Sequence, residues 1–352
     1  MRQTKEEDMR KCLKCGLPEN FQGIIIHEDN ECNYCKFYEK QKEVLNDNDF
    51  LHERFVEQLN QAKAKAKENN AEYDCLVGLS GGKDSTYIIY QLKHRYNMRV
   101  LAFTYDNGFA TEYGRTNIQI ALDKLNVDHI SFAMNREKLR KYNQMCTSLF
   151  KNFCMMCFHL THYYSHQIAA EKNIPLIVNG RTKGQILQFA DSTHLLEPFE
   201  YTSCFEEYEY QMFKKSAEKT AKLCRDLPKI EGEVRALSYF MYHDYDPQEV
   251  MDFLEERLGW VKPKAGVAHA DCWAHPVAEQ LQMGAKAYPI MTGELAYMVR
   301  SGEISKEEAQ RRIEKESVTG KTVDNKITER FNKEMKMQTK EEDNAKECTR
   351  VS

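Results

Sequence analysis

The six residues SGGKDS at positions 80–85 combine the groups with which proteins bind phosphate. An apolar stretch precedes them and a helical pattern follows, so we expect a loop between a strand and the start of a helix. The glycines let backbone N–H groups approach an anion closely, while the helix dipole, the lysine and the serines add charge and donors. An ordinary glycine turn is the alternative. The expected phosphate-binding residues are Ser80, Gly81, Gly82, Lys83, Asp84 and Ser85.

Two pairs of cysteines near the N-terminus have the spacing of metal ligands. Each pair is C-x-x-C, and sixteen residues separate Cys12 and Cys15 from Cys32 and Cys35. This pattern predicts a tetrahedral four-cysteine Zn²⁺ site, with four buried unliganded cysteines as the alternative. Because the protein would fill all four positions, we expect a structural zinc ribbon and no catalysis there.

A second set of cysteines lies in the middle of the sequence. Cys154 and Cys157 form another C-x-x-C pair before a helical segment, and Cys272 follows much later. Three thiolates can hold a [4Fe-4S] cluster while leaving one iron open. A cysteine pair that carries persulfide, a second zinc site and buried structural thiols are the other interpretations.

Strand-like and helix-like patterns alternate through the centre of the chain. The expected strands are Cys75–Val77, Arg99–Tyr105, His129–Phe132 and Pro175–Gly180, and the clearest helices are Glu112–Leu125 and Cys157–Lys172. This alternation predicts an α/β fold with a doubly wound parallel sheet. Ligands of such sheets bind outside the carboxyl ends of the strands. We therefore expect residues 80–85, 106–108 and 180–185 to border one crevice.

Composition shifts along the chain predict its organisation. We expect a zinc ribbon over residues 1–45, a linker helix over 46–70, an α/β core over 71–195 and a helical part that completes the site over 196–318. The last of these would shape the substrate pocket or an interface in a homodimer. Residues 319–352 are highly charged and poor in core residues, which predicts a mobile tail.

Charge and hydropathy exclude several classes of protein. The net charge is −4 over 352 residues, so no global positive field favours nucleic acid. No stretch of 18 or more apolar residues predicts a membrane span, and the charged N-terminus does not look like a signal peptide. Twelve cysteines with metal-like spacing in such a chain favour the reducing cytoplasm over a disulfide framework.

The loop with the sequence SGGKDS resembles the pyrophosphate loop of the PP-loop ATP pyrophosphatases, which have an adenine nucleotide alpha hydrolase-like fold. The resemblance implies ATP as cosubstrate and Mg²⁺ bridging its phosphates, with Asp84 as a ligand or loop-orienting residue. Such enzymes cleave ATP between the α and β phosphates and adenylate a substrate oxygen. A nitrogen or sulfur nucleophile then displaces AMP.

The resemblance also implies roles for the loops that follow two later strands. Asp106, Asn107 and Gly108 would lie near the adenine and ribose, with a plain turn as the alternative. In the loop that begins at Gly180, Arg181 and Lys183 would neutralise the α-phosphate or the leaving pyrophosphate. Solvent-facing loop cations are the alternative interpretation of these two residues.

Two branches of these enzymes share features with the chain. The N-terminal cysteines, in CLKCGLP and ECNYC, and the segment Met298–Ala309 resemble the N-acetyl sugar amidotransferases. The cysteines at 154, 157 and 272 resemble those of Fe–S-dependent tRNA thiolation enzymes instead. Residues 179–182, with the sequence NGRT, also lack the acidic Gly-Glu expected of the amidotransferases.

These features together predict ATP-dependent adenylation of a carbonyl or amide oxygen on a small molecule, followed by sulfur transfer. Amidotransfer with ammonia from a partner glutaminase is the first alternative, and tRNA thiolation is the second. Either sulfur or ammonia would come from an external donor. A tRNA partner would require a clear basic surface and salt-sensitive binding.

Overall fold

A computed structural model of the chain describes residues 9–187, 205–263 and 271–336. At its centre is a parallel sheet of five strands in the order β3-β2-β1-β4-β5. The strands are β1 (Cys75–Gly78), β2 (Val100–Asp106), β3 (Asp128–Ala133), β4 (Leu176–Asn179) and β5 (Arg235–Ser238). The predicted doubly wound parallel sheet is confirmed. Strand β5 was missed because it lies in a part of the chain that was predicted to be helical.

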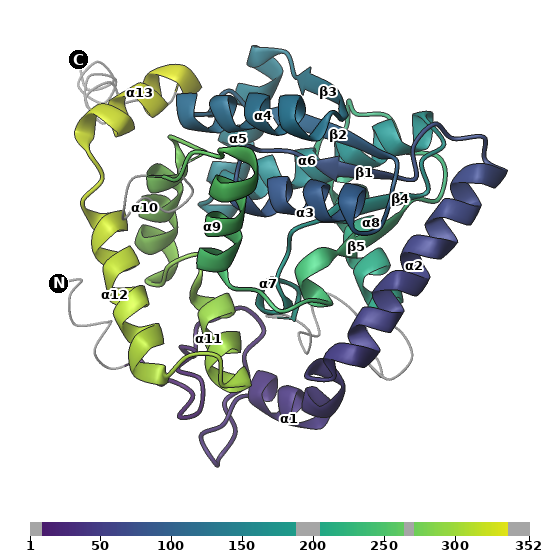
Figure 1. Cartoon of the computed structure of the whole chain (residues 1–352). Helices are drawn as coiled ribbons and strands as arrows, with labels where there is room; N and C mark the ends of the chain where they lie inside the picture. Colours follow the sequence, from purple (N-terminus) through teal and green to yellow (C-terminus); the bar gives the residue numbers. More distant parts are fainter. Residues whose placement is uncertain (1–8, 188–204, 264–270, 337–352) are drawn as a thin grey trace, which may run out of the picture.

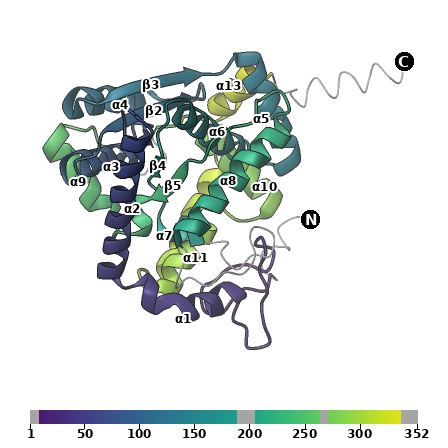
Figure 2. The same cartoon turned by 90° about the vertical axis from the view of Figure 1, so that its right-hand side faces the viewer.

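Helices cover both faces of the sheet, because alternate residues of its strands are apolar and buried. Cys75 and Val77 face one side and Leu76 the other. The first side is covered by α2 (Asn48–Glu68), α3 (Lys83–His94), α4 (Glu112–Leu125) and α9 (Pro247–Leu258). The second is covered by α5 (Arg136–Phe150), α6 (Cys154–Glu171) and α8 (Phe205–Leu223). Figure 2 shows the strands between these two sets of helices.

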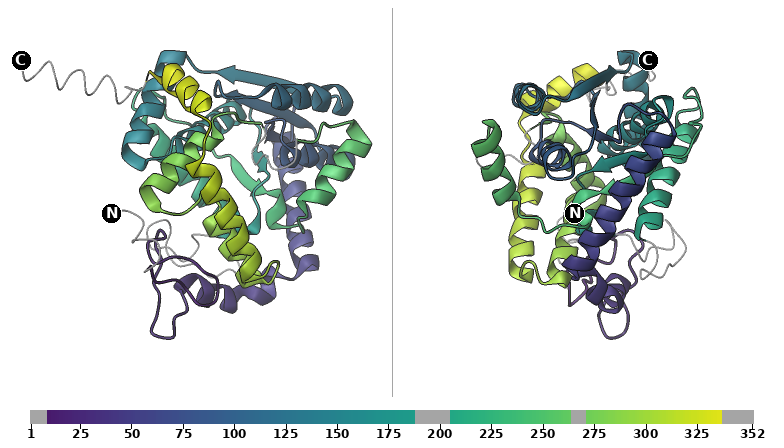
Figure 3. Two further views of the ribbon diagram at one scale, coloured as in Figure 1. Left: turned by 90° about the vertical axis from the view of Figure 1, so that its left-hand side faces the viewer. Right: turned by 45° about the vertical axis from the view of Figure 1, so that its right-hand side comes forward.

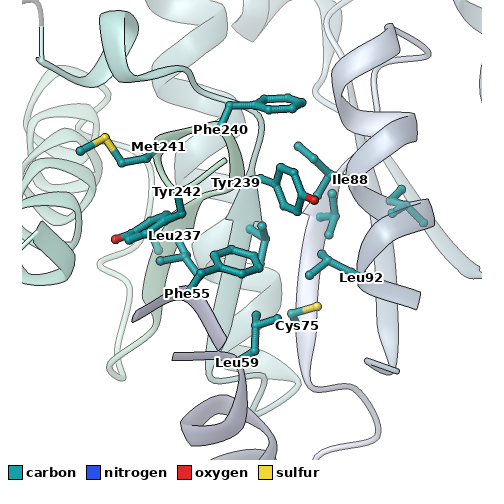
Figure 4. Packing of buried hydrophobic residues seen from close by; sticks show 14 of the residues in the cluster. Phe55, Leu59, Cys75, Ile88, Leu92, Leu237, Tyr239, Phe240, Met241 and Tyr242 are labelled. Carbon is teal, nitrogen blue, oxygen red and sulfur yellow. The ribbon is translucent and has the colours of Figure 1, made fainter. Parts of the chain in front are cut away.

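Aromatic side chains fill the space between the sheet and α2. Phe55 is fully buried and makes edge contacts with Tyr239, whose ring centroid lies 5.3 Å away. Tyr239 belongs to the short 3-10 helix η2 (Tyr239–Met241), which directly follows β5. Figure 4 shows this contact beside Ile88 and Leu92 of α3. Because Phe55 is fully buried among these side chains, we expect Phe55→Ala to cost about 3–5 kcal/mol of unfolding free energy.

The remaining helices connect the N-terminal ribbon to the sheet. They are α1 (Asn33–Leu45), α7 (Lys183–Leu187), α10 (His275–Lys286), α11 (Thr292–Ser301), α12 (Lys306–Lys321) and α13 (Asn325–Met335). Helix α11 contacts α1, α7 and α12. In Figure 1 the ribbon, α1 and α11 lie together at the bottom, and α12 leads from there to α13 near the top. No helix in the described ranges is long and apolar enough to cross a bilayer.

The predicted mobile tail spans residues 319–352, and the structure has a packed helix within it at residues 325–335. These residues form α13, which packs against α5 and α10. Phe331 and Met335, four residues apart on one face of the helix, are buried. The high charge of the segment concealed this narrow apolar stripe. Figure 3 shows the yellow C-terminal helices extending from the ribbon end of the molecule toward β3. Residues 337–352 lie outside the described residues.

Candidate active site

The SGGKDS loop joins β1 to the N-terminus of α3, as the sequence predicted. Gly82 precedes the first turn of α3, and no side chain of the described residues caps it. The N–H groups of that turn and the Lys83 ammonium are therefore available to an anion. A pocket of about 1180 Å³ lies over the loop. Among the residues that line it are Ser80, Gly82, Lys83, Asp84 and Ser85.

Gly81 can be only glycine in this loop. Its φ is +82°, and a Cβ atom there would lie 2.1 Å from the carbonyl oxygen of Gly114 on α4. The indole N–H of Trp260 donates to the Gly81 carbonyl at 3.2 Å. The loop is thus fixed from two sides by residues far away in the sequence. Sequence reasoning did not identify either contact, because no local pattern links residue 81 to residues 114 and 260.

Two carboxylates lie beside the loop. Asp84 accepts hydrogen bonds from the Lys83 ammonium at 3.0 Å and from the Tyr245 hydroxyl at 2.8 Å. Burial and the neighbouring Asp84 carboxylate raise the pKa of Tyr245, so its hydroxyl remains a donor. Asp271 lines the same pocket next to Gly82. Carboxylates on two sides of a phosphate loop are suitable ligands for Mg²⁺.

The residues of the loop after β4 that were predicted to contact the nucleotide point in different directions. Gly180 packs against Asp84, with 3.1 Å between a Cβ built on the glycine and the Asp84 Cβ. Lys183 borders the pocket, but its ammonium donates to the carbonyl of Leu45 at 2.8 Å. Arg181 stacks on Phe158 of α6, with its guanidinium carbon 4.1 Å from the ring centroid. The three residues therefore have different surroundings, and their predicted contact with phosphate stays a prediction.

The loop after β2 contacts the central cysteines. Asp106 and Asn107 accept hydrogen bonds from the N–H groups of Gly108 and Phe109 at 2.9 and 2.8 Å, which shapes a tight turn. The amide of Asn107 also donates to Cys157 Sγ at 3.7 Å. The segment predicted to border the nucleotide is therefore in direct contact with the cysteine site.

Cys154, Cys157 and Cys272 converge on one apolar cluster at the N-terminus of α6. All three are partly buried and pack against residues that include Phe109, Phe153 and Phe331. An antiparallel bridge between Ala110 and Cys272 places Cys272 next to the end of β2. The fold thus brings a residue from position 272 to the pair at 154 and 157.

The central sulfurs are not arranged for a single metal ion. Among the described residues, only the four N-terminal cysteines form a group that could hold one metal ion. Their sulfur atoms all lie within 4.8 Å of one another. A [4Fe-4S] cluster places each thiolate on a different iron, so its ligands are farther apart than those of one zinc ion. Burial, together with the nearby thiols, raises the pKa of Cys157 to about 12 and that of Cys154 well above its usual range. Burial also raises the pKa of Cys272 to about 11.

Helix α10 contributes a buried carboxyl near this cluster. Glu279 is 2% exposed, and its carboxyl oxygens accept from the backbone N–H of Ile290 at 3.3 Å. Burial raises the pKa of Glu279 to about 7. Sequence reasoning did not identify this residue, since an isolated glutamate on an amphipathic helix normally faces solvent.

Cys12, Cys15, Cys32 and Cys35 form the compact group that their spacing predicted. The Sγ atoms of Cys12 and Cys35 lie 3.8 Å apart, and those of Cys15 and Cys32 lie 3.7 Å apart. Four thiolates placed tetrahedrally at a Zn–S distance of about 2.3 Å are separated by about 3.8 Å. All four are buried. The geometry and donor set therefore fit a structural zinc ion.

Arg300 connects this group to α11. The guanidinium is buried and donates to Cys15 Sγ at 3.6 Å. Burial lowers the pKa of Arg300, but the thiolates around it outweigh this effect and the pKa lies above its usual value. A buried guanidinium here offsets the negative charge that four thiolates leave around a divalent ion.

No protein-family model matches the chain, and no curated protein matches it. Several solved structures are similar to the chain. The U34-tRNA thiolase NcsA of Methanococcus maripaludis, solved with its [4Fe-4S] cluster, is similar at 15% identity and a TM-score of 0.36, over 87% of this chain and 89% of that chain.

Two further solved structures are similar over part of the chain. The NH₃-dependent NAD synthetase of Campylobacter jejuni has 14% identity and a TM-score of 0.31, over 60% of this chain and 97% of its own. A predicted subunit of tRNA methyltransferase from Methanocaldococcus jannaschii has 15% identity and a TM-score of 0.30, over 52% of this chain and 75% of its own. Similarities at this level assign neither a substrate nor a reaction to this chain.

Proposed function

We propose that the protein is an ATP pyrophosphatase that adenylates a carbonyl or amide oxygen of a small substrate and then replaces that oxygen with sulfur. The observation that carries the proposal is the position of two consecutive residues. Asp271 lines the pocket over the phosphate loop, and Cys272 packs with Cys154 and Cys157. The pocket over the loop and the cysteine site are therefore neighbours.

The backbone holds these two residues in place. The N–H of Thr111 donates to the Asp271 carbonyl at 3.0 Å, and the N–H of Trp273 donates to the Phe109 carbonyl at 3.0 Å. Asp271 lies in a turn beside Gly82, whereas Cys272 pairs with Ala110 in an isolated bridge, so the two residues contact different neighbours. This geometry explains how one short segment contributes a carboxylate to the phosphate pocket and a thiol to the cysteine cluster.

The adenylation step uses the residues around the loop. Lys83 and the N–H groups at the start of α3 would stabilise the charge that builds on the β and γ phosphates as the α phosphorus is attacked. Asp84 and Asp271 would hold Mg²⁺, with Asp84 oriented by the Tyr245 hydroxyl. The substrate oxygen forms a bond to the α phosphorus, the bond between the α phosphorus and the bridging oxygen breaks, and pyrophosphate leaves.

The central cysteines would supply the sulfur side of the reaction. Cys154, Cys157 and Cys272 fit as ligands of a [4Fe-4S] cluster, which when bound would offer an open iron for hydrosulfide. Hydrosulfide forms the new C–S bond at the adenylated carbon, the C–O bond breaks, and AMP leaves with the electron pair. The hydrosulfide proton ends on the neighbouring nitrogen or in solvent.

The nucleotide half of the proposal is tested by the products formed from ATP. The purified protein is incubated with Mg²⁺, α-labelled ATP and a small-molecule metabolite extract, and we expect labelled AMP and pyrophosphate. Lys83→Ala should reduce this turnover at least about 100-fold. Lys65→Ala, which removes an exposed lysine of α2, is the matched control. Formation of ADP and phosphate without AMP would overturn the assignment.

The sulfur half is tested by the donor that supports turnover. Anaerobically prepared protein is analysed for iron and sulfide and then supplied with either labelled sulfide or labelled ammonium. We expect label from sulfide in the product and none from ammonium. Iron-free protein that incorporates only ammonium would instead indicate an amidotransferase. Tight, salt-sensitive tRNA binding in a gel shift would replace the small substrate with tRNA.

A further inference from the structure

Arg181 occupies a position that the nucleotide chemistry does not use. Its neighbours Thr182, Lys183 and Gly184 line the phosphate pocket, whereas the Arg181 side chain lies over Phe158 of α6. Helices α3 and α6 cover opposite faces of the sheet. The guanidinium therefore contacts the residue that directly follows Cys157 in α6.

Two aromatic rings and two carboxylates surround the guanidinium without binding it. Its central carbon lies 4.1 Å from the Phe158 centroid and 5.9 Å from that of Phe213. Glu294 accepts from the Thr182 hydroxyl at 2.8 Å and from the Gln185 amide at 3.1 Å. Glu209 accepts from the backbone of Ser238 and the hydroxyl of Tyr242, each at 2.9 Å.

The acidic neighbours are therefore engaged elsewhere, and within the described ranges no oxygen accepts a hydrogen bond from the Arg181 guanidinium. Burial lowers the pKa of Arg181 to about 10, with Glu294 and Glu209 opposing this effect, so the group still carries its charge at neutral pH. A partly buried guanidinium with a stacked face and free N–H edges favours an incoming oxyanion.

We infer that Arg181 binds a carboxylate of the small substrate, which makes the substrate an organic acid. The inference deepens the proposed function and rests on it for the identity of the site. It reassigns Arg181 from the ATP phosphates to substrate recognition.

The surroundings favour a single carboxylate over a phosphate or a nucleic-acid backbone. Guanidinium and carboxylate are both planar and pair through two parallel hydrogen bonds. Burial lowers the pKa of His159 to about 4 and holds that of His162 well below its usual range, so both nearby imidazoles are neutral at pH 7. The Arg181 guanidinium with two neutral imidazoles and two aromatic rings matches a singly charged group attached to an apolar or sugar-like body.

The inference is tested by binding, without turnover. Wild-type protein with Mg²⁺ and α,β-methylene ATP is titrated with benzoate and, separately, with its neutral isostere benzamide, and saturation-transfer NMR measures their binding. We expect benzoate to bind at least about tenfold more tightly than benzamide. Arg181→Gln should abolish this preference, and Arg181→Lys should retain only part of it because lysine lacks the planar fork.

Arg235→Gln is the matched control, since Arg235 also stacks on a ring, that of Tyr210 at 4.7 Å, but on the exposed edge of β5. It should leave benzoate binding unchanged. Equal binding of benzoate and benzamide, undetectable benzoate binding, or stronger competition by inorganic phosphate would each overturn the inference. So would a loss of α,β-methylene ATP binding in Arg181→Gln. Failure of ATP turnover alone would overturn the proposed function while carboxylate binding at Arg181 still stood.

Discussion

The N-terminal and central cysteine sets share the C-x-x-C spacing but differ in what the fold places around them. The N-terminal set has four buried sulfurs, all within 4.8 Å of one another, and a buried guanidinium beside them. The central set has three partly buried sulfurs, is not among the groups of described residues that could hold one metal ion, and receives an amide N–H from Asn107. A closed ligand shell suits a structural role, whereas an incomplete and partly open one suits chemistry.

The largest expected effect is on the N-terminal set. Cys32→Ser should abolish zinc binding, because a structural site in small zinc domains contributes about 10–16 kcal/mol of apparent binding free energy that couples to folding. Elemental analysis and hydrogen exchange over residues 9–45 measure this. Cys224→Ser, at a buried cysteine outside both sets, should keep its zinc. A Cys32→Ser protein with full zinc content would contradict the assignment of a structural zinc site to the N-terminal set.

The central set should behave in the opposite way. Cys157→Ser should lower sulfur transfer by more than about 100-fold through loss of a ligand, while zinc content and ATP binding stay unchanged. Sulfide incorporation, zinc analysis and nucleotide titration on the same preparation provide the three readouts. Loss of zinc from this variant would show that the two sets are not independent.

A buried carboxyl near the central set makes stability depend on pH. The pKa of Glu279 is about 7 in the folded chain, above its ordinary value of 4.5, because burial disfavours its charge. The folded state therefore holds this proton longer than the unfolded state, and its stabilising effect is complete below about pH 4.5 and lost as pH rises through 7. We expect a loss on the order of 2–3 kcal/mol between pH 5 and 8, measured by urea unfolding.

Glu279→Gln keeps the shape of this side chain and removes the titration. Its stability should therefore change less over the same pH interval than that of the wild-type protein. The same pH dependence in both proteins would assign the effect to other groups.

The smallest expected effect concerns the charge beside the N-terminal set. Arg300→Met should destabilise the ribbon by about 2 kcal/mol, the typical contribution of a hydrogen bond to a charged group. Thermal unfolding and the rate of zinc release to a chelator are the measurements. Arg300→Lys should recover part of the loss. Unchanged zinc release in Arg300→Met would mean that the guanidinium has no electrostatic role at this site.

Local sequence patterns predicted the parts of the fold that depend on short-range order. The strand-loop-helix around residues 80–85 and the helix Glu112–Leu125 follow from apolar periodicity and capping, and the structure has them at those positions. The grouping of Cys12 and Cys15 with Cys32 and Cys35 was also predictable, because two C-x-x-C pairs at this separation are typical of a four-cysteine metal site.

The parts that were not predictable depend on long-range packing. Trp260 and Tyr245 reach the phosphate loop from more than 150 residues away, and no local signal marks them. The direction of the Arg181 side chain depends on its packing against Phe158 of α6, which periodicity does not determine. Helix α13 was overlooked for a different reason. Its apolar stripe of Ile327, Phe331 and Met335 is visible in the sequence. The many charged residues around the stripe predicted a mobile segment instead.

Helix α13 also affects how accessible the central cysteines are to oxidants. Phe331 stacks on Phe153 with centroids 4.5 Å apart and contacts Phe109, and Arg330 covers Trp273 at 3.8 Å. These side chains close the apolar cluster against which Cys154, Cys157 and Cys272 pack. Dioxygen and peroxide reach a thiol faster when it is exposed. We therefore expect α13 to slow the access of oxidants, so that the oxygen sensitivity of the cysteine site would depend partly on residues that take no part in its chemistry.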